Sequence, residues 1–313
     1  MTILITGSEG YLGQALIQRL SEHSIIGIDI RQHARESAAN YQFVPMDIRD
    51  PALTKLMQHH HISHVIHLAS VMQASADPAR DYDIDVNGTA NVLQACCQAH
   101  VSHLTITSSG AAYGYHADNP TWLSETDALR GNPSFAYSHH KRLIEELLAE
   151  YRQRQPQLQQ LVLRPGTVLG ANTDNQITAL FKAKRLLAIQ GSPSPFVFIW
   201  DQDVINIIAQ GVTRSSTGIY NLAGDGAMTI TEIATALNKP LLTLPAWLLR
   251  AALHIGQRLK LTRYSAEQVD FLRYRPVLSN QALKQEFGYT PALSSRATFD
   301  YFIQHNLQQK LPR

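Results

Sequence analysis

Short apolar runs and longer amphipathic stretches alternate through the first half of the chain, from Met1 to about Arg164. The short runs are rich in β-branched residues and have the length of buried strands, whereas the stretches between them carry apolar residues at helical spacing. Alternation of this kind is typical of a parallel sheet with helices on both faces. The predicted strands are Thr2–Ile5, Ser24–Ile28, Gln42–Pro45, Val65–Leu68, Leu104–Thr107 and Leu161–Leu163.

Beyond Pro165 the alternation weakens, and two helices stand out. The stretch from Thr229 to Glu232 is a capping-box pattern, in which a threonine and a glutamate satisfy backbone N–H groups at the start of a helix. A second helix is predicted from Pro245 to Leu259 and is apolar over much of its circumference. We favour packing of this helix against the rest of its domain over the alternative of a lid above an apolar pocket.

The composition is that of a globular protein. The 313 residues leave room for one large α/β domain with an appendage, and 44% hydrophobic residues supply a buried core. The formal net charge is +2 and the cations are scattered, so nucleic acid is not expected as a partner. No apolar run reaches the roughly 18 residues of a membrane span. The first predicted strand begins too close to Met1 to leave room for a signal peptide, which predicts a cytoplasmic protein.

Three conspicuous groups of residues have plain structural explanations. Cys96 and Cys97 are adjacent in a helical pattern, where a disulfide would be strained, so we expect core thiols. The side chains of His59–His61 diverge and no carboxylate or cysteine cluster accompanies them, so we expect a solvated helix end and no metal site. The cations between Lys182 and Arg185 fit a solvated helix face better than a grip on an anionic substrate.

The stretch Thr6–Gly13 ends the first apolar run and opens a helical pattern. Gly7 can take the positive φ of a tight strand-to-helix turn, Gly10 has no Cβ to block a pyrophosphate, and Gly13 lets the helix lie close on the strand. The helix N-terminus offers free N–H groups to phosphates. About 20 residues later the second strand ends in Asp29, as expected of a carboxylate that accepts adenosine-ribose hydroxyls. The combination predicts a dinucleotide site over the alternative of a turn without a ligand.

Further motifs at the strand ends strengthen this prediction. Together they make the chain resemble the extended short-chain dehydrogenases/reductases, in their NAD-dependent epimerase/dehydratase group. The motifs that carry the resemblance are the Thr6–Gly13 turn, Asp29, Asp47-Ile48, Leu68-Ala69, Asn87-Gly88-Thr89, Ser108-Ser109, Tyr137 with Lys141, and Arg164-Pro165-Gly166, with weaker ones at Asp203-Val204, Tyr220–Leu222 and Phe287–Pro291.

The resemblance implies a Rossmann-type doubly wound parallel sheet with a smaller mixed α/β substrate-binding domain. Residues 1–165 and about 196–224 would form the dinucleotide-binding domain, and about 166–195 and 225–313 the other. NAD is the expected cofactor because Asp29 would repel a 2′-phosphate, although Arg31 could neutralise one. Asn87 is expected to be buried beside the active site. The expected cofactor contacts are Gly7, Glu9, Gly10, Tyr11, Leu12, Gly13, Asp29, Ile30, Arg31, Asp47, Ile48, Leu68, Ala69, Ser70, Asn87, Thr107, Ser108, Tyr137, Lys141, Pro165, Gly166 and Thr167.

The predicted catalytic residues are Ser109, Tyr137 and Lys141. Tyr137 and Lys141 are one helical turn apart, so both side chains project from one face of a helix. A nearby ammonium and a positive nicotinamide would stabilise the phenolate and lower a tyrosine pKa that is ordinarily about 10. Ser109 follows the fifth strand and can donate to the substrate oxygen. By resemblance, Lys141 also bonds the nicotinamide ribose.

Departures from the family pattern narrow the reaction. Dehydratases of this group place an acid pair where this chain has Gly110 and Ala111, so we expect reversible hydride transfer at a secondary alcohol or ketone. Nucleotide-sugar epimerases carry an arginine where this chain has Phe196, which makes a nucleotide-sugar epimerase the alternative rather than the first choice. A non-catalytic dinucleotide-binding module is a further alternative. The expected substrate contacts are Met72, Gly110, Tyr113, Phe196, Trp200, Arg273 and Arg275.

The resemblance also implies a homodimer, built on the helices near Asn87–Ala99 and Tyr137–Glu150. We expect their outward positions to include Val92, Cys96, Leu143 and Leu147.

Overall fold

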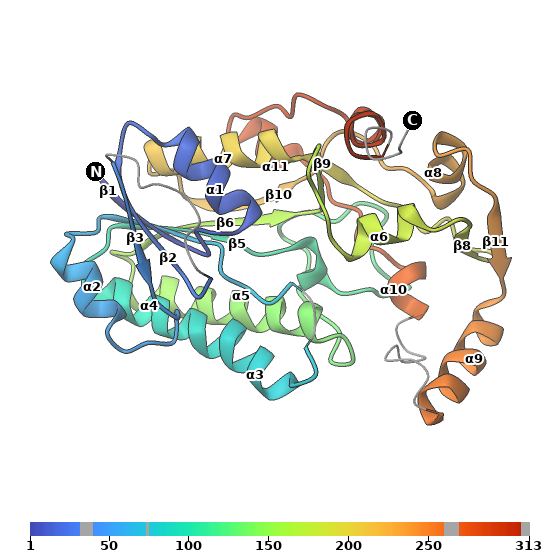
Figure 1. Cartoon of the computed structure of the whole chain (residues 1–313), viewed down its shortest axis with the longest axis horizontal. Helices are drawn as coiled ribbons and strands as arrows, with labels where there is room; N and C mark the ends of the chain where they lie inside the picture. The colour runs from blue at the N-terminus through green and yellow to red at the C-terminus, as the bar shows by residue number, and fades with distance from the viewer. Residues whose placement is uncertain (32–39, 73–74, 260–268, 308–313) are drawn as a thin grey trace.

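A computed structural model describes residues 1–31, 40–72, 75–259 and 269–307 of the chain. Its centre is a seven-stranded sheet in the order β10-β6-β5-β4-β1-β2-β3, and every neighbouring pair is parallel (Figure 1). The strand order reverses between β1 and β4, which is where an open α/β sheet forms a ligand crevice at its carboxyl edge. The strands are β1 Thr2–Thr6, β2 Ser24–Asp29, β3 Tyr41–Pro45, β4 His64–His67, β5 His103–Thr107, β6 Gln159–Pro165 and β10 Gly218–Leu222.

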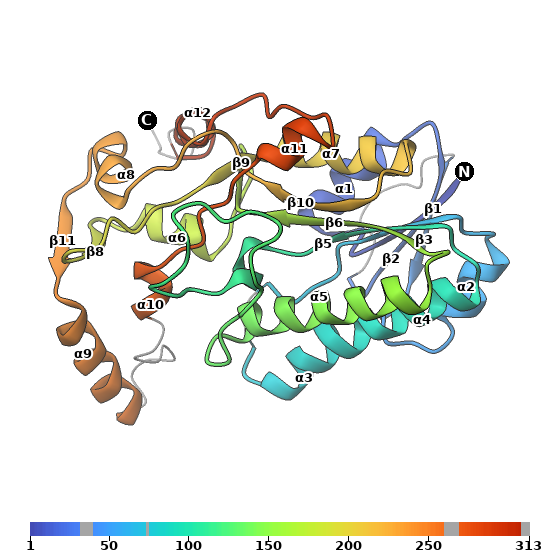
Figure 2. The same ribbon diagram turned by 180° about the vertical axis from the view of Figure 1, so that it is seen from behind.

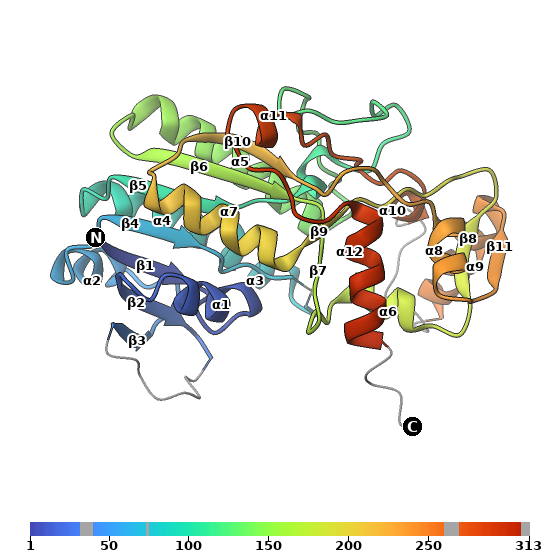
Figure 3. The same cartoon turned by 90° about the horizontal axis from the view of Figure 1, so that it is seen from above.

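Helices cover both faces of this sheet, which confirms the predicted Rossmann-type α/β fold. One face packs against α1 (Tyr11–Arg19), α7 (Asp201–Thr213) and α11 (Gln281–Gln285), and Figure 3 shows α1 and α7 lying across it. The other face packs against α2 (Leu53–His59), α4 (Gly88–Gln98) and α5 (Ala136–Arg154). The inner strands β1, β4 and β5 are buried on both faces because helices cover both sides of the sheet, whereas the edge strand β3 is partly exposed.

Most of the elements after β6 gather at one end of the molecule, where α6, β8, β9, α8 and α12 share an aromatic core that includes Phe181, Phe198 and Phe299 (Figure 2). Two short parallel pairs, β7 with β9 and β8 with β11, belong to this end. The capping box predicted at Thr229–Glu232 is confirmed at the start of α8. The bounds here are β7 Thr167–Leu169, α6 Gln176–Lys182, β8 Leu186–Ile189, β9 Phe198–Trp200, α8 Ile230–Ala236, β11 Leu241–Leu244, α9 Ala246–Arg258, α10 Val269–Arg273, α12 Ser295–Phe302 and η4 Ile303–Leu307.

The expectation that the helix from Pro245 to Leu259 packs against its domain is wrong. Its counterpart, α9, projects from the end of the molecule and has no buried residue (Figure 1). The side chains of Trp247 and Ile255 are 70% and 58% exposed. Periodicity shows which face of a helix is apolar, but it does not show whether another element reaches that face.

Two of the four residues expected on the outer face of the dimer helices, Val92 and Cys96, are buried instead. Val92 and Cys96 are fully buried between α4 and the sheet, so they belong to the core of the chain itself. Leu143 and Leu147 of α5 are half-buried. Cys96 and Cys97 are free thiols, and the first is buried as predicted. No helix in the described part of the chain is long and apolar enough to cross a bilayer.

Candidate active site

The glycine turn between β1 and α1 is packed too tightly for side chains. Gly7 has a φ of +70°, and a Cβ there would lie 2.9 Å from the backbone nitrogen of Ala69. A Cβ on Gly13 would lie 2.4 Å from the carbonyl oxygen of Gly7. The backbone N–H of Gly7 donates to the carbonyl of Ile28 at 2.9 Å, which anchors the turn to the end of β2. The turn therefore lies between the ends of β2 and β4, at the point where the strand order reverses.

Asp29 is held against this turn. Its carboxylate accepts hydrogen bonds from the backbone N–H groups of Glu9 at 3.0 Å and Arg31 at 2.9 Å. The side chain of Arg31 reaches back to Asp29, with Nε and Oδ1 3.4 Å apart, and is otherwise largely exposed. Ile30 is exposed. The carboxylate is therefore fixed at the end of β2, with a cation beside it.

Residues after β3 are arranged around Arg49. Its guanidinium bonds Asp47, with Nη2 and Oδ2 2.6 Å apart, and this hydrogen bond holds the pKa of the Asp47 carboxyl below its usual range. Arg49 also bonds Asp83, with Nη1 and Oδ2 2.7 Å apart. Ile48 points into the core, where it occupies the space that a Cβ on Gly88 would need.

Asn87 is not buried, which corrects the expectation from sequence. Its side chain is exposed, and its amide donates to Asp83 Oδ1 at 2.8 Å. The buried polar residue of this segment is Asp85, which the sequence analysis did not single out. The difference arises because Asp83–Asn87 form a single π-helical turn, η1, between α3 (Pro78–Tyr82) and α4. A π-turn changes which side chains face the sheet.

The segment after β4 approaches the glycine turn. The hydroxyl of Thr6 accepts hydrogen bonds from the backbone N–H groups of Leu68 at 3.2 Å and Ala69 at 3.3 Å. Ser70 donates to the carboxylate of Asp85 at 3.1 Å. Met72 is 64% exposed. This segment is thus bonded to the end of β1 on one side and, through Asp85, to His140 of α5 on the other.

The structure brings Ser109, Tyr137 and Lys141 together. Ser109 follows β5 and caps the short helix η2 (Gly110–Tyr113), while Tyr137 and Lys141 lie in the first two turns of α5. Lys141 Nζ donates to the carbonyl of Thr107 at 3.1 Å and lies 5.7 Å from the centre of the Tyr137 ring. The three side chains therefore meet at the carboxyl edge of β5.

Burial shifts the titration of these groups. Burial raises the pKa of Tyr137, a hydrogen bond with the Ser109 side chain lowers it, and the charge of Asp85 raises it. Burial lowers the pKa of Lys141, which the charges of Asp85 and Glu145 oppose. The charges of Asp85 and Glu145 thus offset part of the cost of burying the Lys141 ammonium.

A buried ion pair fixes α5 to β6. Arg164 bonds both carboxylate oxygens of Glu145, at 2.6 Å from Nη2 and 2.8 Å from Nε, and both side chains are almost completely buried. Ser108 donates to the same carboxylate at 2.5 Å, and Arg164 also donates to the hydroxyl of Tyr113 at 2.7 Å. Arg164 belongs to a motif that the sequence analysis noted, whereas Glu145 was missed because only the fold brings the two together.

Tyr113 is a core residue rather than an open contact for a substrate. It is fully buried, and its hydroxyl donates to the carbonyl of Ser124 at 2.8 Å and lies 2.9 Å from the amide oxygen of Asn221. Gly110 is also buried, packed against Leu278. Both residues belong to the buried helix η2, which Ser109 caps.

The segment after β6 lines the same edge of the sheet. Pro165, Gly166 and Thr167 are half-buried, and the N–H of Gly166 donates to the carbonyl of Leu222 at 2.9 Å. Trp200 lies further along, in contact with the ring of Tyr301.

A guanidinium lies on the face of Phe196. The Cζ atom of Arg275 is 3.9 Å from the centre of this ring and 4.6 Å from that of Phe271. Its Nε and Nη2 atoms are buried and have no hydrogen-bond partner among the described residues. Phe271 contacts Phe135, whose ring is 6.3 Å from that of Tyr137. Two aromatic rings, those of Phe271 and Phe135, thus connect this guanidinium to the predicted catalytic tyrosine.

Arg273 is less available than Arg275. Its Nη1 lies 3.8 Å from the carboxylate of Asp270, and its guanidinium stacks on Tyr274 at 4.6 Å.

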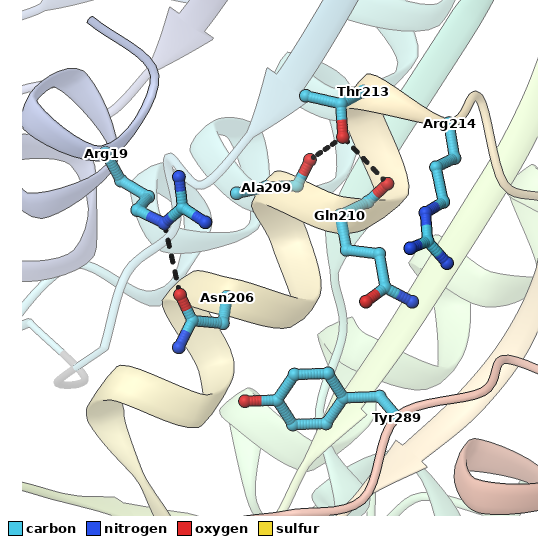
Figure 4. A pocket seen from close by; sticks show the side chains of 7 residues that line it. All are labelled: Arg19, Asn206, Ala209, Gln210, Thr213, Arg214 and Tyr289. Carbon is cyan, nitrogen blue, oxygen red and sulfur yellow. Dashed lines mark hydrogen bonds between the residues drawn. The ribbon is translucent and has the colours of Figure 1, made fainter.

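Two cavities lie beside α1 and α7, away from the catalytic groups. The larger, of about 430 Å³, is lined by Arg19 of α1, by residues of α7 with Arg214 at its end, and by Tyr289 (Figure 4). The smaller, of about 240 Å³, includes Tyr11 and Asp201, whose side chains are hydrogen-bonded to each other. The larger cavity has no residue of the predicted site in its lining.

The family model of the NAD-dependent epimerase/dehydratase family matches residues 3–200, which include the glycine turn, Asp29 and the Ser109–Tyr137–Lys141 group. The chain belongs to this family. The predicted resemblance and the predicted cofactor, NAD, are thereby confirmed.

Known proteins of this family resemble the chain over most of its length. A UDP-glucose 4-epimerase of Mycolicibacterium smegmatis is 29% identical over 262 residues, which are 76% of this chain and 82% of that protein. The structure of a Thermotoga maritima UDP-glucose 4-epimerase with UDP-glucose superposes with a TM-score of 0.76 at 19% identity, covering 100% of both chains. A Thermus thermophilus UDP-glucose 4-epimerase in complex with NAD gives a TM-score of 0.74 at 22% identity and covers 99% of this chain and 100% of that one.

Proposed function

We propose that the protein is an NAD-dependent oxidoreductase that transfers a hydride reversibly at the carbon of a secondary alcohol or ketone. The observation that carries the proposal is the meeting of Ser109, Tyr137 and Lys141 at the carboxyl end of β5, on the same edge of the sheet as the glycine turn after β1. A phenol, an ammonium and a hydroxyl in this arrangement can handle the proton of a substrate hydroxyl group. The cofactor, when bound, accepts or returns the hydride.

Each side chain has a distinct role in this proposal. Tyr137 removes the proton of the substrate hydroxyl during oxidation and returns it during reduction. Lys141, held by the carbonyl of Thr107, supplies a positive charge beside the phenolate and would bond the nicotinamide ribose when the cofactor is bound. Ser109 donates to the substrate oxygen as its charge changes.

The proposed cofactor contacts follow the same edge of the sheet. The tight glycine turn suits a pyrophosphate, because no side chain blocks the approach of the phosphates. Asp29 faces the turn and suits the ribose hydroxyls, which favours NAD over NADP even with Arg31 beside it. We further propose a cytoplasmic location.

A nucleotide-sugar epimerase is the second candidate, and Arg275 favours it. From sequence, Phe196 in place of the usual arginine argues against a diphosphate. In the structure, the guanidinium of Arg275 covers the ring of Phe196 and leaves two buried nitrogens unpaired among the described residues. A buried cation without a partner is costly, so an anionic group of the substrate is a natural partner for it.

A thermal-shift screen separates the two candidates. With NAD present, nucleoside diphosphates and nucleotide sugars are compared with hydroxy and keto compounds, on the wild type and on Arg275→Met. Stabilisation by hydroxy or keto compounds alone supports the first candidate. Selective stabilisation by a diphosphate sugar that Arg275→Met abolishes, and that the exposed control Arg258→Met retains, replaces it with the epimerase.

Replacing Tyr137 by Phe tests the proposed chemistry itself. We expect nearly all hydride transfer to be lost, because the missing hydroxyl acts on the substrate, while the dissociation constant of NADH changes less than about threefold. Turnover and calorimetry measure the two effects. A Tyr137→Phe enzyme that keeps roughly a tenth or more of wild-type turnover would show that another group handles the proton.

A further inference from the structure

A carboxylate is buried behind the predicted catalytic helix. The side chain of Asp85 is 1% exposed, and each of its oxygens has a partner. Oδ1 accepts hydrogen bonds from the backbone N–H of Val71 at 2.7 Å and from the hydroxyl of Ser70 at 3.1 Å. Oδ2 lies 2.9 Å from Nδ1 of His140. One carboxylate thus connects η1, the segment after β4 and α5.

His140 is the residue immediately before Lys141 in α5. Its side chain is 7% exposed, and its ring meets the ring of Tyr82 edge to face at 5.6 Å. A buried carboxylate and imidazole gain little net stability from each other, since well-packed apolar residues would stabilise the fold as well. Stability alone therefore does not account for this pair, and its position beside Lys141 is the more informative fact.

The other ionisable groups in this region are neutral or already engaged. His67 of β4 bonds Thr6 and Thr89 through its two ring nitrogens, and burial lowers its pKa to about 3, so it is neutral. From η1, Asp83 is bound to Arg49. From α3, the carboxylate of Asp81 accepts the N–H of Ser75.

On α5 itself, the carboxylate of Glu145 is committed to Arg164, and His139 lies on the far side of His140 with ring centres 6.4 Å apart. Among these carboxylates, Asp85 is the one that is hydrogen-bonded to the residue next to Lys141, and its charge raises the pKa of Lys141.

We propose that Asp85 and His140 are positioning residues for the Tyr137–Lys141 group: their hydrogen bond ties α5 to the segment after β4, and the carboxylate places a negative charge behind the ammonium. The inference rests on the proposed function of Tyr137 and Lys141. Asp85 and His140 lie outside the motifs noted in the sequence, and they act on the site through their bonds to each other and to Ser70.

The sign of the effect follows from the geometry. A negative charge near Lys141 favours its protonated form, and the same charge opposes ionisation of Tyr137. Asp85 raises the pKa of both groups. Its removal must therefore lower both, so the pH range in which Tyr137 is a phenolate and Lys141 an ammonium moves as a whole to lower pH.

Asp85→Asn tests the charge with little change of shape. The asparagine oxygen can accept from Ser70 and Val71, and its amide can donate to a neutral His140. We expect both limbs of the pH profile of kcat for alcohol oxidation to move down by about half a pH unit or more, with a smaller change in KM. His139→Asn, one residue away and outside the pair, is the matched control and leaves the profile in place.

A second variant tests the hydrogen bond. His140→Leu removes the donor and should lower kcat and weaken NADH binding, since α5, which carries Lys141, loses its bond to Asp85. His140→Asn restores a donor near the Nδ1 position and should recover most of the loss. An Asp85→Asn or His140→Leu protein with an unchanged pH profile and unchanged NADH affinity overturns the inference.

A measurement without turnover separates this inference from the proposed function. The ionisation of Tyr137 is followed by NMR of protein labelled at the tyrosine Cζ carbon, with Tyr137→Phe identifying the resonance. A lower Tyr137 pKa in Asp85→Asn supports the charge effect even if no substrate is turned over. Full activity of Tyr137→Phe would then refute only the proposed function.

An unchanged Tyr137 pKa in Asp85→Asn, in a protein whose turnover needs Tyr137, refutes only the proposed role of Asp85 and His140. If Asp85→Asn does not fold, the same titration in His140→Asn and His140→Leu decides: no difference between them and the wild type overturns the inference.

Discussion

At the scale of single residues, the site depends on how each side chain is held. Ser109 shows this directly, because it accepts the N–H of Ala111 at 3.1 Å as a helix cap and also bonds Tyr137. The first bond caps helix η2, and the second lowers the pKa of Tyr137. A substitution at Ser109 therefore changes the titration of the site as well as its shape.

Ser109→Ala should move the acidic limb of alcohol oxidation to higher pH. Oxidation needs the phenolate of Tyr137, so the rate rises as pH passes through the pKa of this group. The hydrogen bond with Ser109 lowers that pKa, and its loss raises it. The pH dependence of kcat measures the limb, and Ser109→Thr, which keeps a hydroxyl, is the control. A limb that stays in place in Ser109→Ala would show that the serine does not influence Tyr137.

At the scale of elements, the catalytic helix is placed by the ion pair between Glu145 of α5 and Arg164 of β6. Three nitrogen–oxygen contacts of 2.6 to 3.1 Å join the two buried side chains. Removal of one partner leaves the other charge buried and unpaired. The pair thus fixes where Lys141, one turn before Glu145, meets the end of β5.

Arg164→Met should lower the free energy of unfolding by about 3–5 kcal/mol, because Glu145 remains buried as an uncompensated charge. The double variant Arg164→Met with Glu145→Leu should recover most of this loss, since no charge is then buried. Urea denaturation of both variants measures the difference. Equal destabilisation of the single and double variants would contradict the explanation.

The two apolar helices α4 and α9 should respond differently to substitution. Leu93 of α4 is fully buried, so Leu93→Ala should cost about 2–5 kcal/mol of unfolding free energy. Trp247 of α9 is 70% exposed, so Trp247→Ser should change it by no more than about 0.5 kcal/mol. Thermal and urea unfolding provide the values. A large loss in Trp247→Ser would show that α9 is covered in solution.

At the scale of the whole molecule, a homodimer stays a prediction. The helices α4 and α5 lie side by side on one face of the sheet, but Val92 and Cys96 serve the core of the single chain (Figure 2). Leu143 and Leu147 of α5 are half-buried, Leu147 against this same core, and their exposed parts are the apolar surface proposed for a partner subunit.

Light scattering at micromolar concentration should give a mass near twice 34.9 kDa. Leu143→Glu with Leu147→Glu should lower this mass toward the monomer, because charges would be buried at the interface. A wild-type mass near 34.9 kDa at these concentrations would contradict the prediction.

The sequence alone determined the parallel sheet, the glycine turn and the relation between Tyr137 and Lys141. Each of these rests on local information: apolar runs specify buried strands, glycines permit a tight turn, and a four-residue spacing puts two side chains on one helix face. The predicted strands accordingly differ from the observed ones by only one or two residues at their ends.

Only the tertiary structure decided which distant residues meet and which apolar faces are covered. Asp85 and His140 are 55 residues apart, and a π-turn, which no periodicity reveals, turns Asp85 inward and Asn87 outward. The guanidinium of Arg275 lies on the ring of Phe196, 79 positions earlier in the sequence. Helix α9 has no buried residue, although α10 contacts it through the Arg250–Asp270 ion pair. Contacts of this kind carry no local pattern, since they depend on where whole elements are placed once the core has formed.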